Sequence, residues 1–169
     1  MTESNTQPAP EQAVAPDETL RAAQDLLFFA YRDFTNAADV ILAELGLGRA
    51  HHRAMHFIGR NPGLTVSDLL VILRITKQSL ARVLSDLMDR GYVAQAPGRS
   101  DRRQRLLSLT PSGSALERRL YESQKTRLGP AFLAAGEQAV AGFSSVLRGI
   151  MDDTARAYID NNAPANRRP

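Results

Sequence analysis

Residues 64–90 place apolar and polar side chains with the period of a helix, in two stretches separated by a very short turn. The first stretch opens with Thr65 as an N-cap candidate and carries Asp68 three residues later, which is the arrangement of a capping box. The second stretch follows Thr76, and its apolar residues recur at steps of three and four and so share one helical face: Leu80, Val83, Leu84 and Leu87. The pattern predicts a helix-turn-helix.

The opposite face of the second predicted helix carries polar and basic side chains. Those at its start are Thr76, Lys77, Gln78 and Ser79, and Arg82 follows one turn later. In helix-turn-helix proteins the N-terminal residues of the second helix meet the bases, and arginine and glutamine can pair with guanine and adenine through two hydrogen bonds. We therefore expect this face to contact DNA, with Gln78, Ser79 and Arg82 supplying most of the base discrimination.

A basic hairpin is predicted directly after this helix. Gly91 suits the left-handed residue that ends a helix, residues 92–95 and 106–109 have the composition of two short strands, and a loop joins them. The loop segment holds one acid, Asp101, which we expect to orient an arginine rather than touch DNA, among four arginines: Arg99, Arg102, Arg103 and Arg105. A basic hairpin beside a recognition helix is a wing, and its arginines suit contacts to phosphates.

At these residues the chain resembles the MarR family of bacterial transcription regulators. Three motifs carry the resemblance: the helix end with Leu87, Gly91 and Val93, the wing with Asp101 and Arg103, and the exit with Leu109, Thr110 and Gly113. The segment at residues 51–53 further resembles the PetP-like branch of that family. The resemblance implies a homodimer, a wing in the minor groove and a cleft that responds to a small-molecule effector.

The fold class that follows is mainly α with a small β-hairpin wing, an α+β winged helix-turn-helix head carried by a helical dimerisation arm. The expected parts are a disordered tail (1–15), an N-terminal dimerisation helix (16–46), the DNA-binding domain (47–110), C-terminal dimerisation helices (111–160) and a mobile tail (161–169). We expect Gly129 and Pro130 to kink or interrupt the helix after Thr110, and a last helix over residues 136–159. The apolar stripes on these helices predict the dimer interface: Leu20, Leu27, Phe34, Leu116, Leu120, Phe143, Leu147 and Ile150.

All three histidines lie between the first predicted helix and the helix-turn-helix. His52 and His56 are four residues apart and therefore share a helical face, which is the spacing of a two-histidine metal site. A metal-responsive regulator is thus one hypothesis, ordinary hydrogen bonding is a second, and a place in the effector cleft is a third. We favour no metal and assign the cleft, as its candidates, Phe28, Tyr31, His52 and His56.

Charge and composition narrow the class further. Of the net charge of +3, residues 74–105 contribute eight basic and three acidic side chains, a local excess of +5 that suits a surface facing phosphates. Cysteine is absent, which excludes disulfides and thiol-based sensing by this chain. No catalytic motif, cofactor motif, membrane span or signal peptide is evident, so we expect a cytoplasmic, non-enzymatic partner of double-stranded DNA. The competing hypothesis is a winged-helix module that binds proteins instead.

Overall fold

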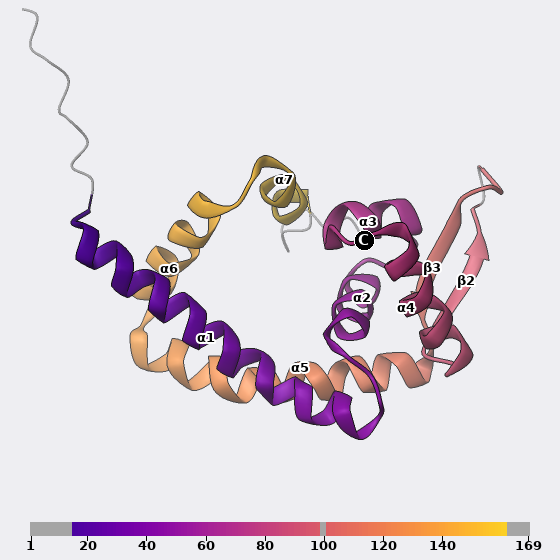
Figure 1. The fold of residues 1–169 in the computed structure, drawn as a ribbon, viewed down its shortest axis with the longest axis horizontal. Helices are drawn as coiled ribbons and strands as arrows, with labels where there is room; N and C mark the ends of the chain where they lie inside the picture. The colour runs from indigo at the N-terminus through magenta and orange to yellow at the C-terminus, as the bar shows by residue number, and fades with distance from the viewer. Residues whose placement is uncertain (1–14, 99–100, 162–169) are drawn as a thin grey trace, which may run out of the picture. The chain divides into compact units, whose positions relative to one another are not determined.

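A computed structural model of the chain describes residues 15–98 and 101–161. The chain divides into two compact units, residues 1–33 and 34–169, and helix α1 (Asp17–Glu44) begins in the first unit and ends in the second (Figure 1). In the first unit, large apolar side chains of α1 are exposed to solvent: Leu20, Leu26, Leu27, Phe28, Phe29 and Tyr31. The helix expected after Pro16 is therefore present, and much of its apolar surface is uncovered.

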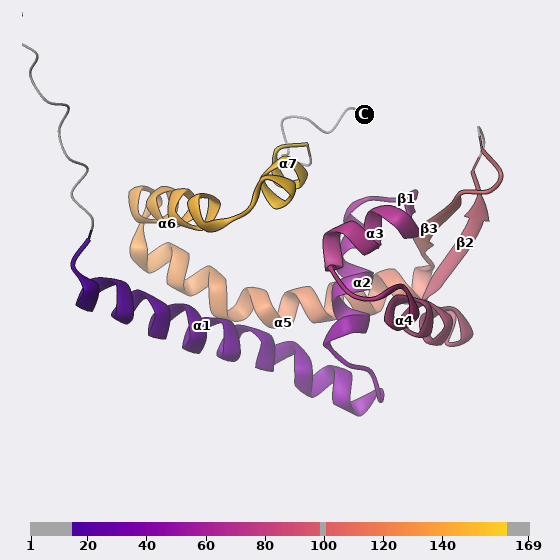
Figure 2. The ribbon, with the colours of Figure 1, turned by 45° about the horizontal axis from the view of Figure 1, so that its top comes forward.

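The second unit contains the helix-turn-helix and a small sheet. Its elements in order are α2 (Arg49–Arg60), β1 (Leu64–Thr65), α3 (Val66–Leu73), α4 (Lys77–Asp89), β2 (Val93–Pro97) and β3 (Arg105–Leu109). The strands pair antiparallel in the order β1-β3-β2, and the β2–β3 hairpin lies beside α4 (Figure 2). The predicted hairpin is confirmed with slightly longer strands. The two-residue strand β1, too short to show a periodic pattern, was not expected.

The core of this unit lies where the end of α1, α2, α3, α4 and the sheet meet the start of α5 (Pro111–Ala135). Its most deeply buried side chains are Leu42, Met55, Ile58, Leu69, Leu80, Leu87, Leu107 and Leu120. Leu116 is also buried in this cluster. The expectation that Leu116 and Leu120 contact a second subunit is therefore wrong, because the chain's own core already covers them.

Two expectations about the C-terminal helices also need correction. Helix α5 continues through Pro130 without interruption. Residues 125–131 are exposed, so solvent can hydrogen-bond the carbonyl that loses its partner at the proline. The last predicted helix is two helices, α6 (Glu137–Ile150) and α7 (Asp153–Asn161). The break occurs because Met151 is extended and the Asp152 carboxylate accepts the backbone N–H of Ala155 at 2.8 Å, which begins a new helix.

Candidate nucleic-acid interface

Local hydrogen bonds define the start of both helices of the helix-turn-helix. The Thr65 hydroxyl oxygen accepts the N–H of Asp68 at 3.1 Å, and the Asp68 carboxylate accepts the N–H of Thr65 at 3.1 Å, so the capping box is complete. The Thr76 hydroxyl oxygen accepts the N–H of Ser79 at 3.1 Å and caps α4. Between them Arg74 is left-handed, with φ of 50°, and ends α3. The predicted boundaries of both helices are confirmed.

Helix α4 buries one face and exposes the other, as its periodicity predicts. The four apolar residues of the buried face lie in the core, whereas the side chains of Lys77, Gln78, Ser79 and Arg82 are exposed. Thr76 is exposed as well, but its hydroxyl also donates to Ser79 Oγ at 2.8 Å. Part of the hydrogen-bonding capacity of these two hydroxyls therefore serves the cap. The longer side chains of Lys77, Gln78 and Arg82 remain available on this face to contact a partner.

The basic residues of this region divide into two groups. Arg74 pairs with Asp152 at 2.5 Å, and Arg90 pairs with Asp86 at 2.6 Å, so both have acidic partners within the chain. In the described part of the chain, no acidic side chain pairs with the cations of α4 and the wing, which are Lys77, Arg82, Arg102, Arg103 and Arg105. These five exposed charges lie on the surface expected to meet DNA, and they give that surface a capacity to replace phosphate counterions.

The wing turn is shaped by backbone contacts. The Gly98 N–H donates to the Gln104 carbonyl at 3.0 Å, and the Asp101 carboxylate accepts the backbone N–H of Arg103 at 2.9 Å. A Cβ at position 98 would lie 2.6 Å from the Asp101 carbonyl oxygen, so the turn needs glycine there. Asp101 thus positions the backbone of Arg103. The sequence led us to expect that Asp101 would instead orient an arginine guanidinium. Arg99 lies outside the described residues.

The exit motif fastens α5 to the end of the recognition helix. Gly91 is left-handed, with φ of 72°, and the Thr110 hydroxyl donates to its carbonyl at 2.6 Å. The Thr110 N–H donates to the Tyr92 carbonyl at 3.0 Å, and its hydroxyl oxygen accepts the N–H of Gly113 at 3.0 Å. A Cβ on Gly113 would lie only 1.9 Å from the Tyr92 carbonyl oxygen. Threonine and glycine at these positions therefore allow the wing and α4 to sit directly against α5.

A polar network that the sequence did not predict ties the C-terminal end of α4 to the loop before α2. Arg90 donates to the Leu45 carbonyl at 2.6 Å and to Asp86, whose other carboxylate oxygen lies 3.1 Å from His51 Nε2. His51 Nδ1 accepts the Gly48 N–H at 3.1 Å. The hydrogen bond from Arg90, above all, holds the pKa of Asp86 below its ordinary value. The only part of this network that the sequence indicates is the ion pair of Asp86 and Arg90, which are four residues apart on one helix.

The two histidines of the metal hypothesis are partly buried rather than grouped with ligands. Partial burial lowers the pKa of His56 to about 4, with smaller contributions from Arg60 and His52, so its ring is neutral at pH 7. Burial also lowers the pKa of His52, against the opposing effect of Asp39. His56 Nδ1 lies 3.6 Å from Glu117, whose pKa burial raises. Across the described residues, no three His, Cys, Asp or Glu side chains gather as metal ligands.

The predicted effector and dimer residues occupy different environments. Phe28 and Tyr31 belong to the first unit and His52 and His56 to the second, and none of the four lines the cavity found in the second unit. Their role in a cleft stays a prediction. Among the predicted dimer residues outside the core, Leu147 and Phe34 are half-buried, and four are exposed: Leu20, Leu27, Phe143 and Ile150.

A helix-turn-helix beside a three-stranded sheet whose β2–β3 hairpin is basic defines the winged helix-turn-helix class. The family model described as the MarR family matches residues 45–104. The chain is 53% identical over 142 residues to the HTH-type transcriptional regulator PetP of Rhodobacter capsulatus, a match that covers 84% of this chain and 86% of PetP. The chain belongs to the MarR family of transcriptional regulators, as its three motifs predict.

Solved structures share the fold. FabT of Streptococcus pneumoniae in complex with DNA matches with a TM-score of 0.67 and 19% identity over 78% of this chain and 94% of FabT. A mutant of MarR from E. coli complexed with operator DNA matches with a TM-score of 0.61 and 18% identity over 83% of this chain and 100% of that protein. No helix in the described ranges is both long and apolar enough to cross a membrane.

Proposed function

We propose that this regulator binds DNA as a homodimer and recognises a pseudo-palindromic operator, with α4 in the major groove and the wing in the minor groove. The observation that carries the proposal is the exposed face of α4, where Lys77, Gln78 and Arg82 lie free of acidic partners in the described chain, beside the basic wing hairpin. The DNA complexes of FabT and MarR, which share this fold, support DNA as the partner. The role is regulatory rather than catalytic.

Within this proposal the side chains have distinct tasks. Gln78, Ser79 and Arg82 read base edges, because they lie on the solvent face of the first turns of α4, and Ser79 does so with the hydrogen-bonding capacity that the cap leaves to its hydroxyl. The wing arginines, Arg99, Arg102, Arg103 and Arg105, contact phosphates and the minor groove. Thr76 and Lys77 at the start of the helix complete the contacts. Affinity then falls steeply as salt rises, since each cation releases counterions from the duplex.

Uncovered apolar surface supports the homodimer. On α6, Phe143, Val146 and Ile150 are 46%, 65% and 65% exposed, and they are spaced three and four residues apart on one face. Contiguous apolar surface of this kind marks an interaction site. Introducing a charge by Phe143→Glu should convert the dimer into a monomer in sedimentation velocity. Ser145→Glu, on the opposite face of the same helix, should leave the dimer intact.

The experiment that tests the proposal is selection of bound sequences from a random duplex library at near-physiological salt, repeated at higher salt. A dimer should enrich an inverted repeat whose half-sites lie one helical turn apart, about 34 Å. If nothing is enriched and binding simply disappears as salt rises, the basic surface is non-specific and the protein-interaction hypothesis replaces this one. The same operator then serves to test effectors, which would act by favouring a dimer whose heads are wrongly spaced for DNA.

A further inference from the structure

The backbone at the C-terminal end of α1 is fixed by its own hydrogen bonds. Gly46 is left-handed, with φ of 62°, and its N–H donates to the Ala43 carbonyl at 3.1 Å. The Leu47 N–H donates to the Leu42 carbonyl at 2.8 Å, which completes a Schellman motif. The last carbonyls of a helix carry the negative end of its dipole and attract cations. The last turn of α1 contains no basic residue, so a cation for this end has to come from another segment.

The recognition helix supplies that cation. Arg90 ends α4, and its side chain donates to the Leu45 carbonyl at 2.6 Å and to the Asp86 carboxylate at 2.6 Å. A guanidinium presents its donors in a rigid planar fork, so two hydrogen bonds in different directions fix both its place and its orientation. The C-terminal end of α4 is therefore tied to the residue that follows α1, 45 positions earlier in the chain.

A third helix end takes part in the same contacts. His51 Nδ1 accepts the Gly48 N–H at 3.1 Å at the start of α2, and His51 Nε2 lies 3.1 Å from the Asp86 oxygen that Arg90 does not use. A ring nitrogen that accepts an N–H carries no proton, so in the neutral ring Nε2 donates to Asp86. One carboxylate oxygen is thus held by each partner. We name four residues the end cluster: Leu45, His51, Asp86 and Arg90.

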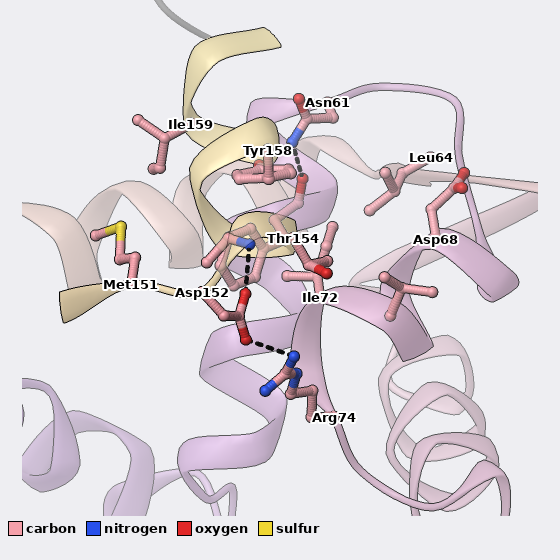
Figure 3. A pocket seen from close by; sticks show the side chains of 13 residues that line it. Asn61, Leu64, Asp68, Ile72, Arg74, Met151, Asp152, Thr154, Tyr158 and Ile159 are labelled. Atoms are coloured by element: carbon pink, nitrogen blue, oxygen red, sulfur yellow. Dashed lines mark hydrogen bonds and ion pairs between the residues drawn. The ribbon is translucent and has the colours of Figure 1, made fainter. Parts of the chain in front are cut away.

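The arginine on the other side of α4 is held less firmly. Arg74, in the turn before α4, pairs with the exposed carboxylate of Asp152 at 2.5 Å, at the edge of the cavity between α7, α2 and α3 (Figure 3). The Arg74 side chain is 68% exposed, whereas that of Arg90 is 38% exposed. Water and salt screen an exposed ion pair, so it contributes little to the position of a helix. The end cluster is therefore the firmer of the two attachments.

A small change of angle at the end of α4 becomes a large displacement at the bases. Apolar packing holds α4 against the core but has no direction of its own, so directed hydrogen bonds decide the angle. Helix α4 has 13 residues and is therefore about 20 Å long. A tilt of about 10° at Arg90 would move the start of the helix, with Lys77 and Gln78, by about 3.4 Å, which is about the rise of one base pair.

We propose that Arg90 is a positioning residue for operator recognition: the end cluster fixes the angle between α4 and the end of α1, and thereby the half-site spacing that the dimer accepts. Residues 34–44 of α1 belong to the same compact unit as α4. In a dimer, the angle between α4 and this segment decides where the two recognition helices meet DNA. Spacing is defined only for a homodimer on an operator, so this role rests on the proposed function.

The DNA test compares the selected operator with two versions that carry one base pair more or one fewer between the half-sites. The unaltered protein should bind the selected operator about tenfold more tightly than either version. In Arg90→Ala this ratio should fall by about threefold or more, because several angles of α4 become accessible. Base preference within each half-site should persist, because Gln78, Ser79 and Arg82 are unchanged.

Two further variants separate geometry from charge. Arg90→Lys keeps the charge without the planar fork, so it should lose the spacing ratio as Arg90→Ala does. Arg119→Ala is the matched control, because it removes an exposed ion pair with Glu44, also at the end of α1, and leaves the end cluster intact. Its spacing ratio should equal that of the unaltered protein. Arg90→Gln replaces Arg90→Ala if the alanine variant does not fold.

An unchanged spacing ratio in Arg90→Ala would overturn the proposal. If the ratio stays and the slope of log affinity against log salt falls by about 1, Arg90 contacts a phosphate instead. An equal loss of affinity at all three spacings would show that Arg90 only stabilises the fold. A full spacing ratio in Arg90→Lys would overturn the role of the fork, and a reduced ratio in Arg119→Ala would show that any ion pair at the end of α1 has this effect.

A second measurement needs no DNA. The chain contains no cysteine, so Asn36→Cys on α1 and Ala81→Cys on α4, both at exposed positions, can carry spin labels at these two positions alone. Labelled protein is mixed with an excess of unlabelled protein, so that each measured distance lies within one chain. The distance distribution should broaden in Arg90→Ala and stay unchanged in Arg119→Ala.

An unchanged distance distribution in Arg90→Ala would overturn the positioning role. If the selection enriches no inverted repeat, the proposed function fails, and the distance measurement still decides whether Arg90 fixes the angle of α4.

Discussion

Replacing Gly113 by alanine tests how closely the start of α5 must approach the strand that follows the recognition helix. The added Cβ would lie 1.9 Å from the Tyr92 carbonyl oxygen and 2.8 Å from its carbonyl carbon, both of which are backbone atoms. Ordinary contact begins near 3.4 Å, so α5 and the backbone of Tyr92 would have to separate by about 1.5 Å. A shift of that size breaks the hydrogen bonds of Thr110 to the Gly91 and Tyr92 carbonyls.

The expected change in the free energy of unfolding combines two costs and one gain. Two lost hydrogen bonds cost about 1 kcal/mol each, and overpacking costs about 1–3 kcal/mol. Alanine regains up to about 1 kcal/mol over glycine through its helix propensity. The free energy of unfolding should therefore fall by roughly 2–4 kcal/mol. It is measured by urea denaturation at one fixed protein concentration, because the proposed homodimer would make stability concentration-dependent.

A matched control exists in the same helix. Nothing lies within 4 Å of a Cβ built on Gly129, so Gly129→Ala should be neutral or stabilise by up to about 1 kcal/mol. If Gly113→Ala were as stable as the Gly129 variant, the close approach between α5 and Tyr92 would not exist in solution. The steric requirement for glycine in the exit motif would then be refuted.

Three further predictions concern DNA reading, pH and the polar network. Arg82→Ala should reduce the free energy of operator binding by about 1–3 kcal/mol and blur the preference at one base position. Arg103→Ala should weaken binding to all DNA sequences alike and lower the slope of log affinity against log salt by about 1. Base preference that survives Arg82→Ala unchanged would show that α4 is oriented differently. The pKa of His56 falls from 6.5 to about 4 on folding, so the unfolded chain binds more protons between these pH values, and the free energy of unfolding should fall as pH falls through that window. In urea titrations at several pH values, this free energy should decline less steeply with falling pH in His56→Gln than in the unaltered protein. An identical decline would contradict the pKa shift. Asp86→Ala removes the carboxylate that Arg90 and His51 contact, and it should lower the free energy of unfolding by about 1 kcal/mol. Asp89→Ala, which removes only a 3.4 Å hydrogen bond from Ser85, is the near-neutral control. Equal stabilities of the two variants would mean that the network contributes nothing measurable.

The features that the sequence predicted correctly depend on neighbours a few residues apart. Thr65, Thr76 and Thr110 cap their helices through backbone groups three residues away, and Gly91 ends α4 because its own φ is positive. The inward face of α4 follows from a helical repeat of 3.6 residues. Such interactions are complete within one or two turns of chain, so the order of residues determines them almost without reference to the rest of the fold. The helix-turn-helix and the wing could therefore be located, and the face of α4 assigned.

What only the tertiary structure decided involves residues distant along the chain. Periodicity places Leu120 on the apolar face of its helix, but it does not say whether the same chain or a second subunit covers that face. In the structure, the chain's own core covers it. Arg74 and Arg82 are equal as charges in the sequence, yet Arg74 is neutralised by Asp152, 78 positions away, and Arg82 lies on the solvent face of α4. The cavity in the second unit likewise brings together residues of α2, α3 and α7, which lie far apart along the chain. Local sequence determines which groups are apolar or charged, whereas folding decides which of them face each other, because that depends on how distant segments pack.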